Sequence, residues 1–301
     1  MIRIPVLAAS LAASLAALLP ISLAATAALA QERPVIVVDS YPVAFFAGRL
    51  AGDAAEVRLP VPEGRDPALW RPSIAEIAAI QSADLIALNG SGLADWTTRA
   101  SLPRSRTVDT GRELGADLIA TETVTHSHGA EGEHSHDGVA TYTWLDPELA
   151  AKQASALAGA MARAVPDAPI DANLDALLAD LADLAALGET LPDGASLIAS
   201  HPRYQYLARA YGLDIASLDW DAGAAPDGAQ LAALEAKAKE TGARVFLWEA
   251  EPPAEAREAV GALGLAQVVL PPLAVPPAEG DFVSAMRDGL TALGAALAGG
   301  G

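Results

Sequence analysis

Four of the chain's five histidines lie in one short segment, residues 125–137, which reads THSHGAEGEHSHD. They form two pairs of alternating residues, His126 with His128 and His134 with His136. In an extended chain, alternate side chains project to the same side, so each pair could offer two imidazoles to one cation. Zinc, nickel and copper suit imidazole, and nearby carboxylates could complete their coordination. We predict that the segment binds zinc or another divalent transition metal; the alternative is a solvated insertion without a ligand.

The fifth histidine, His201, follows a predicted strand in the stretch IASHPRYQYLARAYGL. Where a strand turns into a helix in an α/β protein, side chains at the carboxyl end of the strand face the crevice in which ligands bind. A single histidine can equally serve a structural purpose. We therefore treat His201 as a candidate ligand, with a structural role as the alternative.

The elements that must position these residues alternate between short β-branched runs and alanine-rich helical stretches. Strands are expected at Val35–Val38, Ala55–Val61, Asp84–Asn89, Arg106–Asp109, Ser196–Ser200, Asp214–Leu218, Arg244–Trp248 and Ala266–Leu270. This alternation favours parallel sheets flanked by helices, and each half of the chain has enough strands for its own sheet. The predicted fold class is α/β, with two lobes.

Between the two halves lies DAPIDANLDALLADLADLAALGETL, whose leucines recur every three or four residues while its aspartates face away. This spacing predicts a long amphipathic helix that acts as a rigid connector over residues 166–191. The lobes are then expected at residues 32–165 and 192–301. The histidine-rich segment 125–137 belongs to the first lobe, and its polar composition without apolar periodicity predicts a mobile loop.

Two helix starts can be predicted from local chemistry. Ser73 and Glu76 have the spacing of a capping box, in which each side chain accepts a hydrogen bond from a free amide at the helix start. Asp146 precedes Pro147, a residue favoured at the first helical position. We expect the second of these helices to run to about Ala164.

Residues 1–30 have one basic residue, a long apolar run interrupted by Pro20, and a small-residue ending. This pattern is typical of a secretory signal peptide, so we expect a soluble periplasmic protein. The chain contains no cysteine, which argues against disulfides and against a lipoprotein anchor. Its formal net charge of −19 excludes nucleic acid and anionic membranes as favourable partners and suits cations.

Four segments, in order along the chain, match the pattern of one protein family. They read GRDPALWRPSIAEIAAIQSADLIALNGSGLADW, TWLDPELA, SHPRYQYLARAYGL and ARVFLWEAEPP. They resemble, respectively, the first ligand region, the segment after the second ligand, the third ligand segment and the strand leading to the cleft glutamate. The family is the zinc/manganese family of periplasmic ABC-transporter solute-binding proteins, whose zinc-uptake members also carry a histidine-rich loop. The resemblance covers essentially the whole chain after residue 30, and it implies the two-lobed fold with a stiff connector helix.

The resemblance also shows where this chain departs from the family's metal site. Ala68, Tyr142 and Pro271 stand where the family has its first, second and fourth ligands. His201 matches the third ligand, and Glu249 is a second plausible cleft group. Because zinc needs about four ligands, we expect the loop histidines to supply imidazoles that the cleft lacks. Aromatic residues are expected to line a remodelled cleft or to pack in the core; they are Trp70, Tyr142, Tyr204 and Trp248.

The resemblance implies a monomeric periplasmic protein that delivers zinc to the permease of an ABC importer, or buffers it. One alternative keeps the fold but binds a small organic molecule, a metal chelate, or ferric iron held by Tyr142, Tyr204, His201 and Glu249. An enzyme is not expected, because the sequence lacks a nucleophile elbow, a P-loop and a complete dinucleotide-binding motif.

Overall fold

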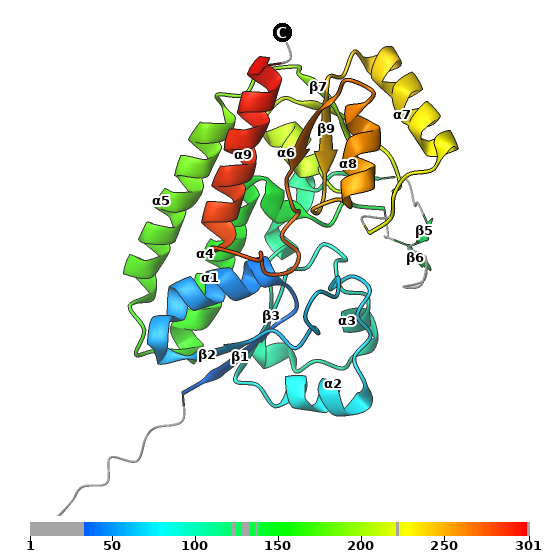
Figure 1. Cartoon of the computed structure of the whole chain (residues 1–301). Helices are drawn as coiled ribbons and strands as arrows, with labels where there is room; N and C mark the ends of the chain where they lie inside the picture. The colour runs from blue at the N-terminus through cyan, green and yellow to red at the C-terminus, as the bar shows by residue number, and fades with distance from the viewer. Residues whose placement is uncertain (1–32, 122–124, 128–132, 136–137, 221–222, 300–301) are drawn as a thin grey trace, which may run out of the picture. The chain divides into compact units, whose positions relative to one another are not determined.

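The computed structural model describes residues 33–121, 125–127, 133–135, 138–220 and 223–299, and for 125–127 and 133–135 the backbone alone. The predicted signal peptide, residues 1–30, lies outside them. Figure 1 shows a chain of alternating strands and helices that builds two separate parallel sheets. The α/β fold class predicted from the sequence is confirmed.

The first sheet contains four parallel strands in the order β2-β1-β3-β4. These strands are β1 Val35–Val38, β2 Glu56–Arg58, β3 Leu85–Leu88 and β4 Thr107–Asp109. The second sheet has the order β10-β9-β7-β8, also all parallel. Its strands are β7 Ser196–Ala199, β8 Asp214–Ser217, β9 Val245–Trp248 and β10 Ala266–Val269. When the second sheet is followed from β8 to β10, both sheets have the same connectivity.

Nine α-helices lie in the part of the chain that the structure describes. They are α1 Tyr41–Ala51, α2 Ile74–Gln81, α3 Trp96–Arg99, α4 Pro147–Ala164, α5 Ile170–Gly188, α6 Gln205–Ala210, α7 Gly228–Thr241, α8 Ala254–Gly261 and α9 Phe282–Gly299. Short 3₁₀ helices are η1 Gly52–Ala54, η2 Arg104–Arg106, η3 Arg112–Asp117 and η5 Thr143–Leu145. In Figure 1, α9 lies alongside α5, and α5 also contacts α1 and α4.

Alternation along each strand sends side chains to two different cores. In β7, Leu197 and Ala199 join the largest buried apolar cluster, whereas Ile198 joins a smaller cluster with residues of α7 and α8. In β1, Ile36 and Val38 join the largest cluster, and Val37 joins a third one. The inner faces of both sheets therefore contribute to one shared core, which α1, α4, α5 and α9 complete.

Helix α5 lies within the predicted connector and buries one leucine stripe. Leu177, Leu181 and Leu184 are buried, while Asp171 and Asp175 are exposed. This is the pattern of an amphipathic helix packed on one side, as the leucine spacing predicts. The lobe limits at 32–165 and 192–301 and the connector limits at 166–191 stay predictions.

Both predicted helix starts are confirmed. The Ser73 hydroxyl accepts from the Glu76 amide at 3.3 Å, and the Glu76 carboxylate accepts from the Ser73 amide at 2.6 Å. At α4, the Asp146 carboxylate accepts from the amide of Glu148 at 3.0 Å. The last residue of α4 is Ala164, as expected.

Composition predicts a mobile loop for the histidine-rich segment, and its described residues form two short paired strands. Its mobility stays a prediction. Strands β5 Thr125–Ser127 and β6 Glu133–Ser135 are antiparallel, with His126 opposite His134. A bridge between Ala120 and Val139 holds the ends of the segment together. Because this bridge brings the two ends side by side, the chain beyond it can pair with itself. His128 and His136 lie outside the described residues.

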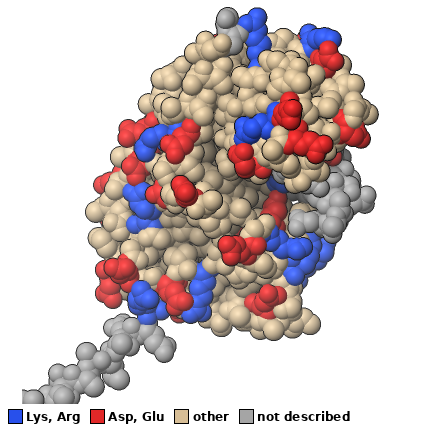
Figure 2. All heavy atoms as spheres, viewed as in Figure 1, with Lys and Arg blue, Asp and Glu red and all other residues tan. Residues whose placement is uncertain are grey.

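Charged side chains of both signs are scattered over the face shown in Figure 2. Within the described ranges, no helix has the length and apolarity needed to cross a bilayer.

Candidate functional site

The carboxyl ends of the central strands in both sheets are tied together in the same way. In the first sheet, the Asn89 amide that follows β3 donates to the Asp39 carboxylate that follows β1, at 2.8 Å. In the second sheet, the Glu249 amide that follows β9 donates to the Ser200 hydroxyl that follows β7, at 3.2 Å. In open α/β sheets ligands bind at these strand ends. The candidate site is therefore expected where loops from the two edges meet.

One arginine joins those loops. The Arg203 Nη1 donates a hydrogen bond to the Asp66 carboxylate at 2.8 Å. The Arg203 Nε lies 2.7 Å from the Glu249 carboxylate. These two groups form an ion pair, but they are not aligned for a hydrogen bond. The guanidinium carbon also lies 4.9 Å from the centre of the Tyr142 ring, within cation–π range. We call Asp66, Tyr142, Arg203 and Glu249 the Arg203 cluster.

The cluster links parts of the chain that are far apart in the sequence. Asp66 follows β2, and Tyr142 immediately precedes η5, whereas Arg203 and Glu249 follow strands of the second sheet. The Tyr142 hydroxyl donates to the same Asp66 oxygen at 3.1 Å. Asp66 thus accepts from two side chains and serves as the anchor on the side of the first sheet.

The electrostatics of the cluster favour a permanently charged arginine. Burial disfavours the charged guanidinium, but the nearby Asp66 and Glu249 carboxylates favour it more, so the pKa of Arg203 lies above its usual range. The Arg203 side chain is 12% exposed, as is that of Glu249. A buried charge of this kind must be paired, and two carboxylates pair with it here.

His201 is buried and lies two residues before Arg203 in the sequence. It is 3% exposed, and its Nδ1 lies 3.4 Å from the carboxylate of Asp219. Its backbone carbonyl accepts from the Arg203 amide at 2.9 Å, which closes the turn between β7 and α6. The side chain therefore lies at the predicted strand end, with a carboxylate as neighbour.

Of the four predicted aromatic residues, Tyr142 belongs to the Arg203 cluster, Trp70 and Trp248 pack in other apolar clusters, and Tyr204 lies close enough to interact with the Glu249 charge. Trp70 packs edge-to-face on Trp96, with ring centres 5.8 Å apart. The Trp248 indole donates to Gln267 at 2.9 Å and its ring packs against Phe246. The Tyr204 hydroxyl donates to the Leu270 carbonyl at 2.6 Å. Of these predicted residues, Tyr142 is the one that contacts Arg203.

At the position expected for the family's first ligand, the residue present has a local role. Ala68 is buried, and its amide donates to the Asp66 carboxylate at 2.9 Å. Among the residues described, no group of three or more histidines, aspartates and glutamates could hold a metal ion. His126, His128, His134 and His136 provide no described side chains, so the predicted ligand set as a whole stays a prediction.

Sequence reasoning missed Asp66 and Arg203. Both lie in segments quoted for the family resemblance, in RDPALW and SHPRYQ. A search for metal ligands passes over arginine because its guanidinium carries donors only. The usable signal was a basic residue two positions after the candidate histidine, together with an aspartate before Pro67.

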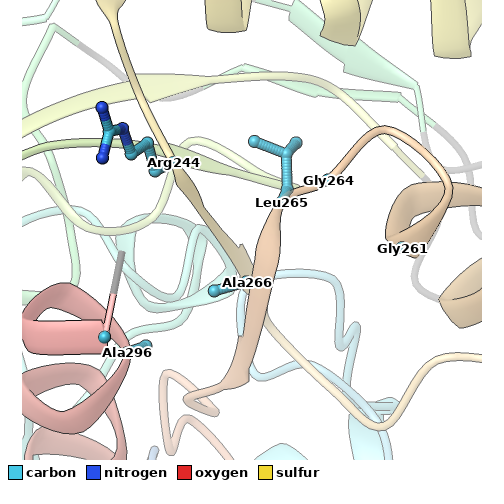
Figure 3. A pocket seen from close by; sticks show the side chains of 7 residues that line it. Arg244, Gly261, Gly264, Leu265, Ala266 and Ala296 are labelled. Atoms are coloured by element: carbon cyan, nitrogen blue, oxygen red, sulfur yellow. The ribbon is translucent and has the colours of Figure 1, made fainter. Parts of the chain in front are cut away.

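Another concavity lies at the opposite edge of the second sheet (Figure 3). Its lining includes Arg244 before β9, Ala266 at the start of β10 and Ala296 of α9, and its volume is about 550 Å³. Because it lies at the amino ends of the strands, it is remote from the edge at which α/β sheets bind ligands.

Two sheets of equal strand order, whose carboxyl-end loops meet around one buried site, define the class of α/β solute-binding proteins. The model of the zinc-uptake complex component A family, described as periplasmic, matches residues 36–296. The chain belongs to this family.

Curated relatives agree with the assignment, and solved structures share the fold. The chain is 29% identical over 234 residues to the high-affinity zinc uptake system protein ZnuA of Bacillus subtilis, covering 71% of this chain and 70% of the relative. It is 28% identical over 212 residues to the zinc-binding lipoprotein AdcA of Streptococcus pneumoniae serotype 4, covering 66% of this chain but 42% of that longer protein. The structure resembles the metal-dependent lipoprotein YcdH of Bacillus subtilis, with a TM-score of 0.73, 24% identity, and coverage of 88% and 99%. It also resembles a crystal structure of ZnuA, with a TM-score of 0.68, 25% identity, and the same coverage.

Proposed function

We propose that the protein captures zinc in the periplasm and delivers it to the membrane permease of an ABC importer. The observation that carries the proposal is the family match over residues 36–296. Relatives named for zinc uptake and zinc binding support zinc as cargo, and a relative named manganese-binding lipoprotein MntA, 26% identical over 180 residues, keeps a second divalent metal in view.

The histidine-rich segment 125–137 is proposed as the principal source of zinc ligands. Near Arg203 the described chain offers one imidazole, that of His201, and the Glu249 carboxylate is already paired with the guanidinium. Zinc prefers nitrogen and sulfur ligands, and the chain contains no cysteine. The imidazoles of His126, His128, His134 and His136, with His201 as a contributor, are the set that we propose. Glu249, which the sequence suggests as a further ligand, is left out of this set because it pairs with Arg203.

Zinc titration by calorimetry tests this proposal on the chain after residue 30. Replacing His126, His128, His134 and His136 by alanine should weaken zinc binding by at least about tenfold, equivalent to about 1.4 kcal/mol. Binding by the unaltered protein should also weaken below about pH 6.5, because protonated imidazole cannot bind zinc.

The matched control is Thr125→Ala/Ser127→Ala/Ser135→Ala, which alters the same two strands and removes no imidazole. This control should retain zinc affinity. Equally tight zinc binding by the quadruple histidine variant would remove the segment from the site.

Ferric iron held by tyrosinates is not favoured by the geometry. The hydroxyls of Tyr142 and Tyr204 both donate hydrogen bonds, to Asp66 and to the Leu270 carbonyl. Burial and the Glu249 charge also raise the pKa of Tyr204 well above its usual value. A phenolate would lose these bonds and add negative charge beside Glu249, so we do not propose this cargo.

We further propose that the protein acts as a monomer, free in the periplasm, as a binding protein and not as an enzyme. Family membership supports the binding role, and the absence of cysteine from the sequence distinguishes it from relatives named lipoproteins. Cell fractionation should recover it with soluble periplasmic markers, and light scattering should give a monomer mass. Recovery in the membrane fraction would contradict free release.

A further inference from the structure

The contacts of Arg203 differ from those of the other paired arginines in the described chain. Five others form an ion pair with a single carboxylate, and their side chains are 33–55% exposed; they are Arg49, Arg58, Arg71, Arg209 and Arg257. Arg203 is far less exposed and lies against two carboxylates, one from each half of the chain. A surface ion pair contributes little, whereas a buried guanidinium between two carboxylates fixes both of them.

The net charge of the Arg203 cluster disfavours a bound divalent cation. The carboxylates of Asp66 and Glu249 carry two negative charges, which would balance one divalent cation. With the Arg203 guanidinium in place the three groups sum to one negative charge. A divalent ion added there would leave one buried positive charge in excess, which is strongly unfavourable.

The hydrogen bonds and packing of Asp66 and Arg203 also disfavour a bound metal ion. The Asp66 Oδ2 that accepts from Arg203 also accepts from the Tyr142 hydroxyl, so its lone pairs face donors. The guanidinium lies against the Tyr142 ring, which completes its desolvation. An incoming metal ion would have to displace the arginine before either carboxylate became available.

We infer that Arg203 is a specificity-determining residue: it acts as the internal cation of this site and keeps free divalent metal ions away from Asp66 and Glu249. This inference deepens the proposed function and rests on it, because it explains why capture of the metal falls to the histidine-rich segment. Removing the guanidinium should leave the two carboxylates, which now flank it, available to a divalent cation.

Manganese(II) chloride is the probe, because Mn²⁺ favours carboxylate ligands over the imidazoles of the segment. All variants carry alanine at His126, His128, His134 and His136 in the otherwise complete chain after residue 30. In this background Arg203→Met removes the charge while keeping an unbranched side chain of similar reach. The matched control is Arg209→Met, which removes a partly exposed arginine paired with Asp146.

Arg203→Met should gain one Mn²⁺ per chain with affinity at least about tenfold above the background, measured by calorimetry and by loss of the free-ion electron paramagnetic resonance signal. Arg209→Met should match the background. Adding Asp66→Asn and Glu249→Gln to Arg203→Met should abolish the gain. No gain in folded Arg203→Met would overturn the inference, as would a background protein that already binds one Mn²⁺ through Asp66.

Arg203→Met can also fail to fold without metal, since it leaves two carboxylates unpaired. Thermal unfolding with and without manganese then decides. A melting temperature that rises with Mn²⁺ concentration supports the inference, and no metal-dependent rise refutes it. These measurements are separable from the zinc test, because every variant here lacks the four segment histidines.

Discussion

The carboxyl edges of the two sheets begin from the same scaffold and end in opposite chemistry. The two sheets have equivalent strand order. In the first, the amide after β3 donates to the side chain after β1, and in the second, the amide after β9 donates to the side chain after β7. In the first sheet that acceptor is the carboxylate of Asp39; in the second it is the hydroxyl of Ser200. The same backbone arrangement therefore supports a buried hydrogen-bond network at the first edge and a long-range ion-pair cluster at the second.

The edge of the first sheet closes on a buried polar network. The Gln153 amide of α4 donates to Asn89 Oδ1 at 2.9 Å and to the Thr110 hydroxyl at 3.1 Å, and it accepts from Thr143 at 2.9 Å. Asp39, also buried, has its pKa raised to about 7, mainly by burial and also by the charge of Asp109, against the lowering effect of the Asn89 amide. Every partner in this network lies between residues 39 and 153, so the network, unlike Asp66 at the same edge, is satisfied within one part of the chain.

The edge of the second sheet instead depends on a partner from the other half. Glu249 follows β9, and its charge is met by Arg203, which needs Asp66 to complete its own pairing. A buried neutral network can be satisfied within one part of the chain. A buried charge needs a counter-charge, and here the pairing extends to a distant part of the chain.

The largest expected effect is that of Arg203→Met on stability. It should lower the free energy of unfolding by about 3–5 kcal/mol, because it leaves two carboxylates of low exposure without their counter-charge. Urea unfolding in the presence of a metal chelator measures this. Arg209→Met, whose ion pair is partly exposed, should cost about 1 kcal/mol or less.

A triple variant separates the loss of pairing from the loss of packing. Arg203→Met/Asp66→Asn/Glu249→Gln removes all three charges and should recover part of the lost stability. If Arg203→Met costs no more than Arg209→Met, the edge of the second sheet does not depend on the pairing of Arg203 with Glu249 and Asp66.

The edge of the first sheet should respond to pH. Folded Asp39 holds its proton up to about pH 7, whereas unfolded chain loses it near the ordinary value of 3.8. Its contribution to stability is therefore complete below pH 3.8 and is lost as pH rises towards 7. Asp39→Asn lacks this dependence and keeps an oxygen for the Asn89 amide. Relative to the original protein, the variant should gain up to about 1.4 kcal/mol per pH unit in this window.

Urea unfolding at several pH values between 4 and 7 measures that slope. Asp53→Asn, which removes one formal charge from an exposed position, is the control. Parallel stability curves for Asp39→Asn and the original protein would show that the buried carboxyl titrates normally.

Much of the fold was predictable because its causes are local. The strand β9 is a fully buried run, VFLW, that follows a helix ending at a left-handed glycine, Gly242, and all eight sheet strands occur where β-branched or apolar runs predicted them. The helix starts at Ser73 and Asp146 were equally readable, since capping needs residues three positions apart or fewer. The pairing of β5 with β6 was not, because it depends on the bridge between Ala120 and Val139.

The Arg203 cluster was much harder to predict, for a physical reason. Asp66 and Arg203 are separated by 137 positions, and no local pattern signals an ion pair across that distance. Family resemblance pointed to the correct segments, and it identified His201 and Glu249 at strand ends. It gave no indication that an arginine would pair with Glu249, because the family pattern directs attention to metal ligands. Composition could not separate Trp70 and Trp248, which pack in apolar clusters, from Tyr142, which contacts the charge.

The smallest expected effect tests the bond that the two edges share. Ser200→Ala removes the hydroxyl that accepts from the Glu249 amide, and Ser200 is buried, so the donor would lose its partner. The variant should lose about 1 kcal/mol of unfolding free energy, and exchange of the Glu249 amide hydrogen should accelerate. Ser217→Ala, at the exposed end of β8, is the matched control and should change stability by less than about 0.5 kcal/mol. Equal values for the two serine variants would mean that the second sheet, unlike the first, does not need its side-chain acceptor, and that Arg203 alone holds Glu249 in place.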